Sequence, residues 1–176
     1  MIRILSASKD TYITNKIVKN SFRATDANVG EAGTLDLFKL YDENVLTGSS
    51  NPIELSRLLV KFPIGEVAAM DSDGVIDISD SSFKCHVKLF DVYGGQTTPS
   101  NFRVVLFPLA QKFDEGSGFD VVNFSDVMAT NFVTASIVNG SAVPWNVPGA
   151  HASGSLGGSN LDIYTSGTLV GPDGSS

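Results

Sequence analysis

The chain has 176 residues, enough for one domain or for a domain with an appendage. Its net charge of −7 argues against sequence-independent binding to a phosphate backbone, so we expect no nucleic-acid partner. The single cysteine, Cys85, excludes an intrachain disulfide, and its place in an alternating apolar run predicts a buried structural thiol.

The first residues carry no recognisable targeting signal. The opening "MIRILSASKD" turns polar after a few apolar residues, and no apolar run approaches the ~20 residues that a membrane helix needs. We therefore expect no membrane contact, synthesis in the cytosol, and a chain that begins directly in a strand.

Most of the remaining chain has the pattern of short β-strands. The run at 57–64 is almost continuously apolar, as in a strand covered on both sides, and the run at 83–94 alternates regularly. Strands are predicted in "DTYIT" at 10–14, "TLDLFKLYD" at 34–42, "RLLVKFPI" at 57–64, "FKCHVKLFDVYG" at 83–94, "NFRVVLFPLA" at 101–110 and "ATNFVTASIV" at 129–138.

Turn formers separate these runs, as in "DANVGEAG", "YGGQTTPS", "DEGSG", "VNGS" and "VPG". Helix signals are few; "IGEVAAMD" predicts one or two turns, with Gly74 just after them. The pattern predicts an all-β fold: an antiparallel, jelly-roll-like β-sandwich with a long loop excursion and at most short helices. We expect the sandwich domain over 1–150. A Gly/Ser-rich C-terminal extension over 151–176 would carry one late strand at "LDIYTSGTLV".

Charge is distributed unevenly along the chain. Basic residues crowd the first quarter, and no lysine or arginine follows Lys112, although acidic residues continue to Asp173. Such polarity favours head-to-tail docking with a neighbouring subunit, because opposite potentials steer association. Unselected variation of the surface is the alternative explanation.

The order of the segments resembles the DNRLRE-type β-sandwich module over roughly residues 8–145. That family opens with a "DTYI" strand, followed by a loop of the "NVG…TL" kind, an "R-x-L-V-K-F" strand, a "V-K-L-F" strand and a "W-x-E-G" corner. The matching residues here are Asp10, Thr11, Tyr12 and Ile13; Asn28, Val29, Gly30, Thr34 and Leu35; Arg57, Leu59, Val60, Lys61 and Phe62; and Glu115 with Gly116. Phe113 stands where the family usually has tryptophan.

The continuation "FDEGSGFDVVNFSDVMATNFVTAS" with "VPWNVPGA" is similar to sandwich modules in virion structural proteins of tailed bacteriophages. Related modules on bacterial surfaces are secreted or bind polysaccharide. The resemblance implies a non-enzymatic virion component that is assembled in the host cytoplasm, because no secretory signal is visible.

Residues 111–136 allow three interpretations. Paired carboxylates could catalyse glycoside hydrolysis, but neighbouring Asp114 and Glu115 would point in opposite directions in an extended chain. Calcium is a second interpretation, with Asp114, Glu115, Asp120 and Asp126 as ligands, although their spacing is not that of an EF-hand.

The third and favoured interpretation is a structural loop. The aromatic residues would pin the loop to the sandwich edge, the glycines would allow its corner, and Trp145 would close the core. The residues are Phe113, Phe119, Phe124, Phe132, Gly116 and Gly118.

Arg57 lies on the strand predicted at 57–64, where it could pair with Asp36 or Asp10 of an adjacent strand or contact an acidic ligand. The two histidines, His86 and His151, have neither a serine nor a cysteine arrangement that would indicate a hydrolase.

We therefore expect a non-enzymatic structural component of a phage virion: a capsid decoration, neck, tail or fibre element. It would act through contacts with other virion proteins, as a homo-oligomer or within a symmetric assembly, and without a cofactor. The alternative is a carbohydrate-binding module of a surface or secreted protein that binds polysaccharide. That alternative needs an exposed aromatic platform built from Tyr12, Tyr41, Tyr93, Tyr164 and Trp145.

Overall fold

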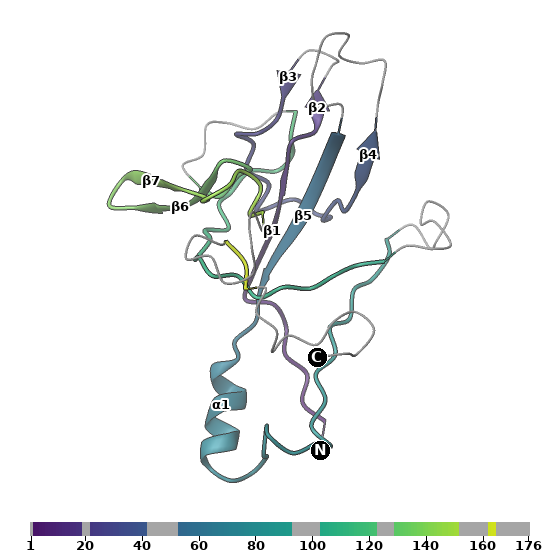
Figure 1. Ribbon diagram of the computed structural model, residues 1–176, viewed down its shortest axis with the longest axis vertical. Coiled ribbons are helices and arrows are strands. Elements are labelled where there is room, and N and C mark those ends of the chain that lie inside the picture. Colours follow the sequence, from purple (N-terminus) through teal and green to yellow (C-terminus); the bar gives the residue numbers. More distant parts are fainter. Residues whose placement is uncertain are drawn as a thin grey trace. The chain divides into compact units, whose positions relative to one another are not determined.

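The computed structural model describes residues 2–18, 22–41, 53–92, 103–122, 129–151 and 162–164. This part of the chain is mostly strands in antiparallel sheets with one short helix, which confirms the all-β prediction at that level (Figure 1). The elements are β1 (Lys9–Thr14), β2 (Ile17–Val18), β3 (Phe22–Arg23), β4 (Lys39–Tyr41), β5 (Ile53–Lys61), α1 (Gly65–Ser72), β6 (Thr134–Val138) and β7 (Ser141–Pro144).

The chain divides into two compact units, which we describe separately. The first unit is Met1–Ser8 with Lys61–Val104, and the second unit is Lys9–Val60 with Val105–Ser176. The domain boundary expected at residue 150 adjoins residues 152–161, which lie outside the described residues.

The main sheet of the second unit has the order β1-β5-β4. Strand β4 runs antiparallel to β5, with Lys39 opposite Leu55. On the other side of β5, the Asn15 amide just after β1 donates to the Leu55 carbonyl oxygen at 3.3 Å. Strand β5 is therefore the central strand, as Figure 1 shows.

Apolar clusters cover both faces of β1 and β5, because successive side chains of a strand point to opposite faces. Tyr12 and Leu58 belong to one cluster, whereas their neighbours Ile13 and Leu59 belong to the other. This confirms that the apolar run at 57–64 includes a strand covered on both sides. The first cluster also contains Val18, Ala24, Ala27, Val29 and Val121, and the second contains Phe113, Ala135, Trp145 and Ala150.

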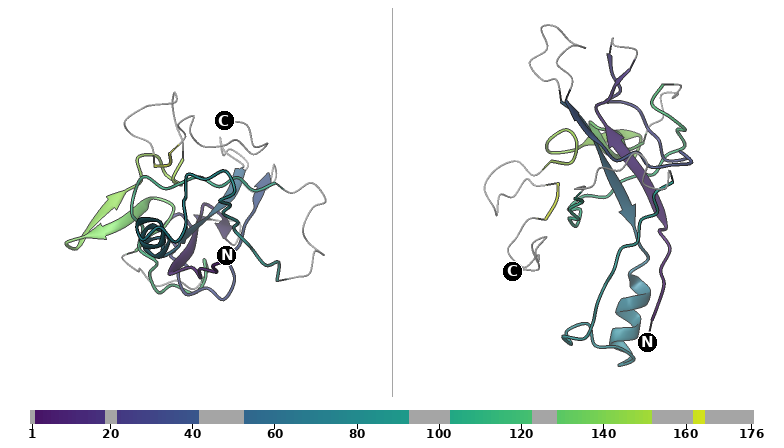
Figure 2. Two further views of the ribbon diagram at one scale, coloured as in Figure 1. Left: turned by 90° about the horizontal axis from the view of Figure 1, so that it is seen from below. Right: turned by 90° about the vertical axis from the view of Figure 1, so that its right-hand side faces the viewer.

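Two small hairpins complete the described strands of the second unit. Strands β2 and β3 pair antiparallel, as do β6 and β7. The turn between β6 and β7 is Asn139–Gly140, with φ of 52° and 77°. Asn-Gly is the preferred pair for a two-residue hairpin turn, because both positions need positive φ. The turn predicted at "VNGS" is thus confirmed, and Figure 2 shows this hairpin projecting from the rest of its unit.

The first unit contains helix α1 and extended chain. The helix confirms the helical turns predicted at "IGEVAAMD", and it ends before Asp73 and Gly74, where Gly74 has φ of 69°. An exposed ion pair links Arg3 to Glu66 at 2.6 Å. None of the described residues of this unit, namely 2–8, 61–92, 103 and 104, is buried.

Three predicted strands are wrong within the described residues. No strand is present at 2–5, at 83–92 or at 103–107, and the first strand begins at Lys9. Residues 84–90 make no backbone hydrogen bond to any other described residue. Cys85 is exposed, so the prediction of a buried thiol is also wrong. Alternation gives a segment two distinct faces, but a strand also needs a partner that completes its ladder.

Candidate functional site

The loop that begins at Phe113 is attached to the second unit through Asn28, which is fully buried. The Asn28 Nδ2 group donates to the carbonyl oxygens of Glu115 and Thr130, both at 2.8 Å. Its Oδ1 atom accepts from the amides of Gly30 at 3.3 Å and Gly118 at 2.9 Å. One side chain therefore joins three segments that are distant in sequence.

Glycines permit this close approach of backbones. Gly116 has φ of 77°, in the left-handed region that favours glycine, as its predicted role requires. A Cβ atom at Gly118 would overlap the Asn28 carbonyl oxygen, and one at Gly30 would overlap the Glu115 carbonyl oxygen. The "NVG" segment at 28–30 and the "EGSG" segment at 115–118 are thus in direct contact.

The acidic residues of the loop bind separate backbone amides. The Asp114 Oδ2 atom accepts from Ile137 N at 2.7 Å, and the Glu115 Oε1 atom accepts from Asp10 N at 2.8 Å. Asp120 Oδ1 accepts from Val122 N at 2.6 Å.

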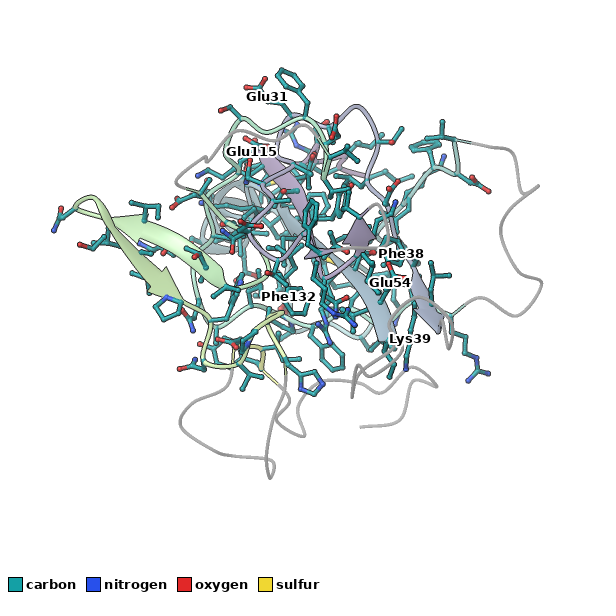
Figure 3. The ribbon with its side chains drawn as sticks, turned by 90° about the horizontal axis from the view of Figure 1, so that it is seen from above. Glu31, Phe38, Lys39, Glu54, Glu115 and Phe132 are labelled. Carbon is teal, nitrogen blue, oxygen red and sulfur yellow. The ribbon has the colours of Figure 1, made fainter. Side chains whose placement is uncertain are left out.

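These carboxylates therefore do not converge. No group of three or more His, Cys, Asp or Glu residues within the described ranges could hold a metal ion. Asp114, Glu115 and Asp120 each accept an amide from a different segment, whereas Asp126, the fourth predicted ligand, lies outside the described residues. In the view of Figure 3, the labels of Glu115 and Glu31 lie at one side of the molecule and that of Glu54, a residue of β5, lies at another.

The predicted aromatic anchors behave differently from one another. Phe113 and Trp145 are buried in the same apolar cluster, and the Trp145 Nε1 group donates to the Asn131 carbonyl oxygen at 2.9 Å. Phe132 is half-buried. Phe119 is 66% exposed, so its predicted role as an anchor is wrong. Phe124 lies outside the described residues.

Arg57 bonds to a backbone carbonyl instead of a carboxylate. Its Nη1 group donates to the Gly149 carbonyl oxygen at 2.6 Å, and the only ion pair among the described residues is Arg3–Glu66. The predicted pairing of Arg57 with Asp36 or Asp10 is therefore wrong. Burial lowers the pKa of the Arg57 guanidinium. The arginine fixes the turn at Gly149, where φ is 90°.

Asp36 interacts with Tyr12 instead. Burial is the main cause that raises the pKa of the Tyr12 phenol to about 12, and the negative charges of Asp36 and Asp120 and a hydrogen bond with Asp36 add to it. A phenolate at this buried position would face two carboxylates.

Two buried acids have roles that the sequence pattern does not reveal. Glu54 Oε2 accepts from Ile17 N at 2.7 Å and ties β5 to β2. Asp162 is fully buried and accepts from the Gln111 side chain, from the amide and side chain of Asn146, and from the Val147 amide, at 2.5–3.0 Å.

These contacts attach part of the C-terminal segment to the second unit. Next to Asp162, Ile163 forms an isolated antiparallel bridge with Leu109. Within the described residues, the expected late strand is therefore reduced to one bridge.

Extended segments of both units expose apolar side chains. Phe90 is 78% exposed and Val92 is 68% exposed. Val87, Leu89 and Val104 are also exposed in the first unit, and Val105, Leu106 and Phe107 are exposed in the second unit. Scattered apolar residues are normal on a protein surface, but a run of them marks an interaction site.

Comparisons with known proteins found no match to a family model, a curated protein or a solved structure. No helix within the described ranges has the length and apolar character needed to cross a bilayer.

Proposed function

We propose that the chain is a non-enzymatic structural component of a phage virion, either a capsid decoration or a neck, tail or fibre element. It would act through subunit contacts and assemble in the host cytoplasm. We further propose that its assembled form is a jelly-roll-like β-sandwich. The order of the segments, which resembles phage sandwich modules, supports both parts of this proposal.

One observation carries the proposal: a described segment of the first unit with a strand-like sequence exposes its apolar side chains. Residues 84–90 make no backbone hydrogen bond to any other described residue, and all of them are exposed. Unpaired strand edges readily accept a strand from another chain. A subunit that works by surface complementarity needs such segments, whereas an enzyme needs convergent reactive groups.

The polar groups of the second unit support a structural role. Asp114 and Glu115, the acids considered for catalysis, each accept a backbone amide from a different segment. A glycosidase needs two carboxyl groups that face each other across the scissile bond, about 5–10 Å apart. These acids instead hold the loop in place.

The carbohydrate-binding alternative has less support. It requires several tyrosine or tryptophan rings on one exposed face, but Tyr12 and Trp145 are buried. Tyr164 is exposed, while Tyr93 and the side chain of Tyr41 lie outside the described residues. Two of the five candidate rings are therefore excluded from such a platform.

Purified phage particles test the proposal. Particles from the encoding phage should contain the chain at a fixed ratio to the major capsid protein, measured by quantitative mass spectrometry after density-gradient purification. Deletion of its gene should yield incomplete particles seen by electron microscopy. Absence of the chain from washed particles, together with retention of the pure protein on bacterial polysaccharide, would contradict the proposal.

A further inference from the structure

We propose that the first unit packs against the first unit of a second copy of this chain. The extended segment 84–90, called the arm, would lie on residues 64–80 of the other copy, called the acidic segment. This inference rests on the proposed function and names the partner of its exposed surface.

The arm has a strand-like sequence, but residues 84–90 make no backbone hydrogen bond to any other described residue. Figure 1 shows it as an extended trace without a strand arrow. Its sequence alternates, with Val87 and Leu89 on one face and Lys84 and Lys88 on the other. Val87 and Leu89 are about half exposed, and Phe90 is 78% exposed. Burial of such side chains in an interface is favourable, because it removes apolar surface from water.

The acidic segment carries the complementary charges. Asp71, Asp73, Asp77 and Asp80 lie there, whereas the arm carries Lys84 and Lys88 and is followed by Asp91 and, further on, Arg103. Within the described residues, the only ion pair of the unit is Arg3–Glu66. Lys84 and Lys88 therefore form no ion pair with a described residue, and the Lys88 Nζ atom lies 4.7 Å from the centroid of the Phe90 ring.

The acidic segment also offers apolar contacts. Ile64 is 70% exposed, and Val75 and Ile78 are about half exposed. It therefore combines acidic and apolar groups, as the arm combines basic and apolar groups. In the second unit, by contrast, the apolar clusters on β1 and β5 are already closed.

These features favour a reciprocal exchange between two copies. Two arms placed against each other would bring Lys84 and Lys88 of one copy close to those of the other, and like charges directly opposite each other are destabilising. Placing each arm on the acidic segment of the other copy satisfies both charge sets at once. A two-fold interface of this kind uses the same surface of both subunits.

A charge-swap experiment on the full chain tests the proposal. One variant carries Lys84→Glu and Lys88→Glu, and the other carries Asp73→Lys and Asp77→Lys, all at exposed positions. The wild type should self-associate, measured by sedimentation equilibrium. Each variant alone should have a dissociation constant at least tenfold higher. An equimolar mixture should form a heterodimer with near wild-type affinity, because the reversed charges again oppose each other.

A matched control separates this effect from net charge. Lys39→Glu with Lys112→Glu makes the same charge change at two exposed lysines of the second unit. Self-association should change less than threefold in that control. If the two reversed variants fail to form a heterodimer, or if the control weakens association equally, the proposal is wrong.

The exposed Cys85 thiol reports directly on coverage of the arm. Its alkylation by a maleimide should be fast in dilute protein and at least fivefold slower at concentrations where the wild type associates. Slow alkylation of a monomer at every concentration would show that the arm is covered by its own chain. That result would overturn this inference but not the virion assignment, which depends on the composition of purified particles.

Discussion

Each unit contains a segment with a strand-like sequence, but only the segment in the second unit forms a paired and buried strand. In the second unit, β5 lies between two other strands, and Leu58 and Leu59 pack into apolar clusters on its two faces. In the first unit, residues 84–90 alternate as regularly, but they are exposed and make no backbone hydrogen bond to any other described residue. The difference shows that a local pattern can fix an extended conformation, whereas a stable strand depends on what lies beside it and above it.

In the second unit, buried polar side chains also form hydrogen bonds with backbone groups. Asn28, Glu54 and Asp162 each bind amides or carbonyls of segments that are distant in sequence. Each such group would destabilise the fold if it lost its partners. The first unit has no buried group of this kind among its described residues. We therefore expect substitutions to affect stability in the second unit and association in the first.

The largest effect is expected at Gly118. A Cβ atom there would overlap the Asn28 carbonyl oxygen, and backbone cannot move away as a side chain can. Gly118→Ala should lower the free energy of unfolding by at least about 4 kcal/mol or prevent folding. Gly33→Ala is the matched control, because no atom lies within 4 Å of its added Cβ. Chemical denaturation of both variants checks this, and equal stability would contradict the described loop contact.

Two phenylalanines of the same loop provide the next comparison. Phe113 is buried beside Trp145, whereas Phe119 is 66% exposed. Phe113→Ala should cost about 3 to 4 kcal/mol, because it leaves a cavity in the core. Phe119→Ala should change the free energy of unfolding by less than about 0.5 kcal/mol. Urea denaturation of the two variants measures both changes in stability. A larger loss of stability in Phe119→Ala than in Phe113→Ala would show that Phe119 is the residue that anchors the loop.

A pH-dependent effect is expected at Tyr12. Its pKa is raised from 10.0 to about 12 in the fold, so the folded state retains the phenol proton to higher pH than the unfolded chain. Its contribution to stability is fully present below pH 10 and is lost as the pH rises through 12, by roughly 3 kcal/mol. Tyr12→Phe should lack this loss. Chemical denaturation of both proteins at pH 9 and pH 11.5 measures how much stability each one loses with rising pH. An equal loss in the wild type and in Tyr12→Phe would argue against a buried phenol.

The smallest effect on stability is expected in the arm. Phe90 is 78% exposed, so Phe90→Ser should alter the free energy of unfolding of the dilute protein by less than about 0.5 kcal/mol. The same change should weaken self-association at high protein concentration. Denaturation and sedimentation of one sample series test both statements. A large loss of stability in the dilute monomer would place Phe90 in a core of its own chain.

The sequence predicts those elements whose signals are local. The strand at Tyr12, the helix before Gly74 and the Asn139–Gly140 hairpin turn were all predictable, because each depends on a few adjacent residues. The role of Gly116 was also predictable, since a corner of the chain requires positive φ.

Long-range polar contacts were not predictable in this way. The Asn28 and Asp162 side chains bind segments far away in sequence, and nothing in their own neighbourhoods indicates those partners. Arg57 was assigned a carboxylate partner because charge is the obvious signal, whereas its actual acceptor is the Gly149 carbonyl oxygen. The burial of Cys85 was mispredicted for a related reason, since alternation does not reveal whether a covering partner is in the same chain.

Hydrogen exchange at two protein concentrations tests the central claim most directly. In dilute protein, amides of β1 and β5 should be strongly protected, whereas amides 84–90 should exchange at nearly unfolded rates. At concentrations where the chain associates, amides 84–90 should become protected, and those of β1 and β5 should change little. Strong protection of residues 84–90 in the dilute monomer would contradict the account.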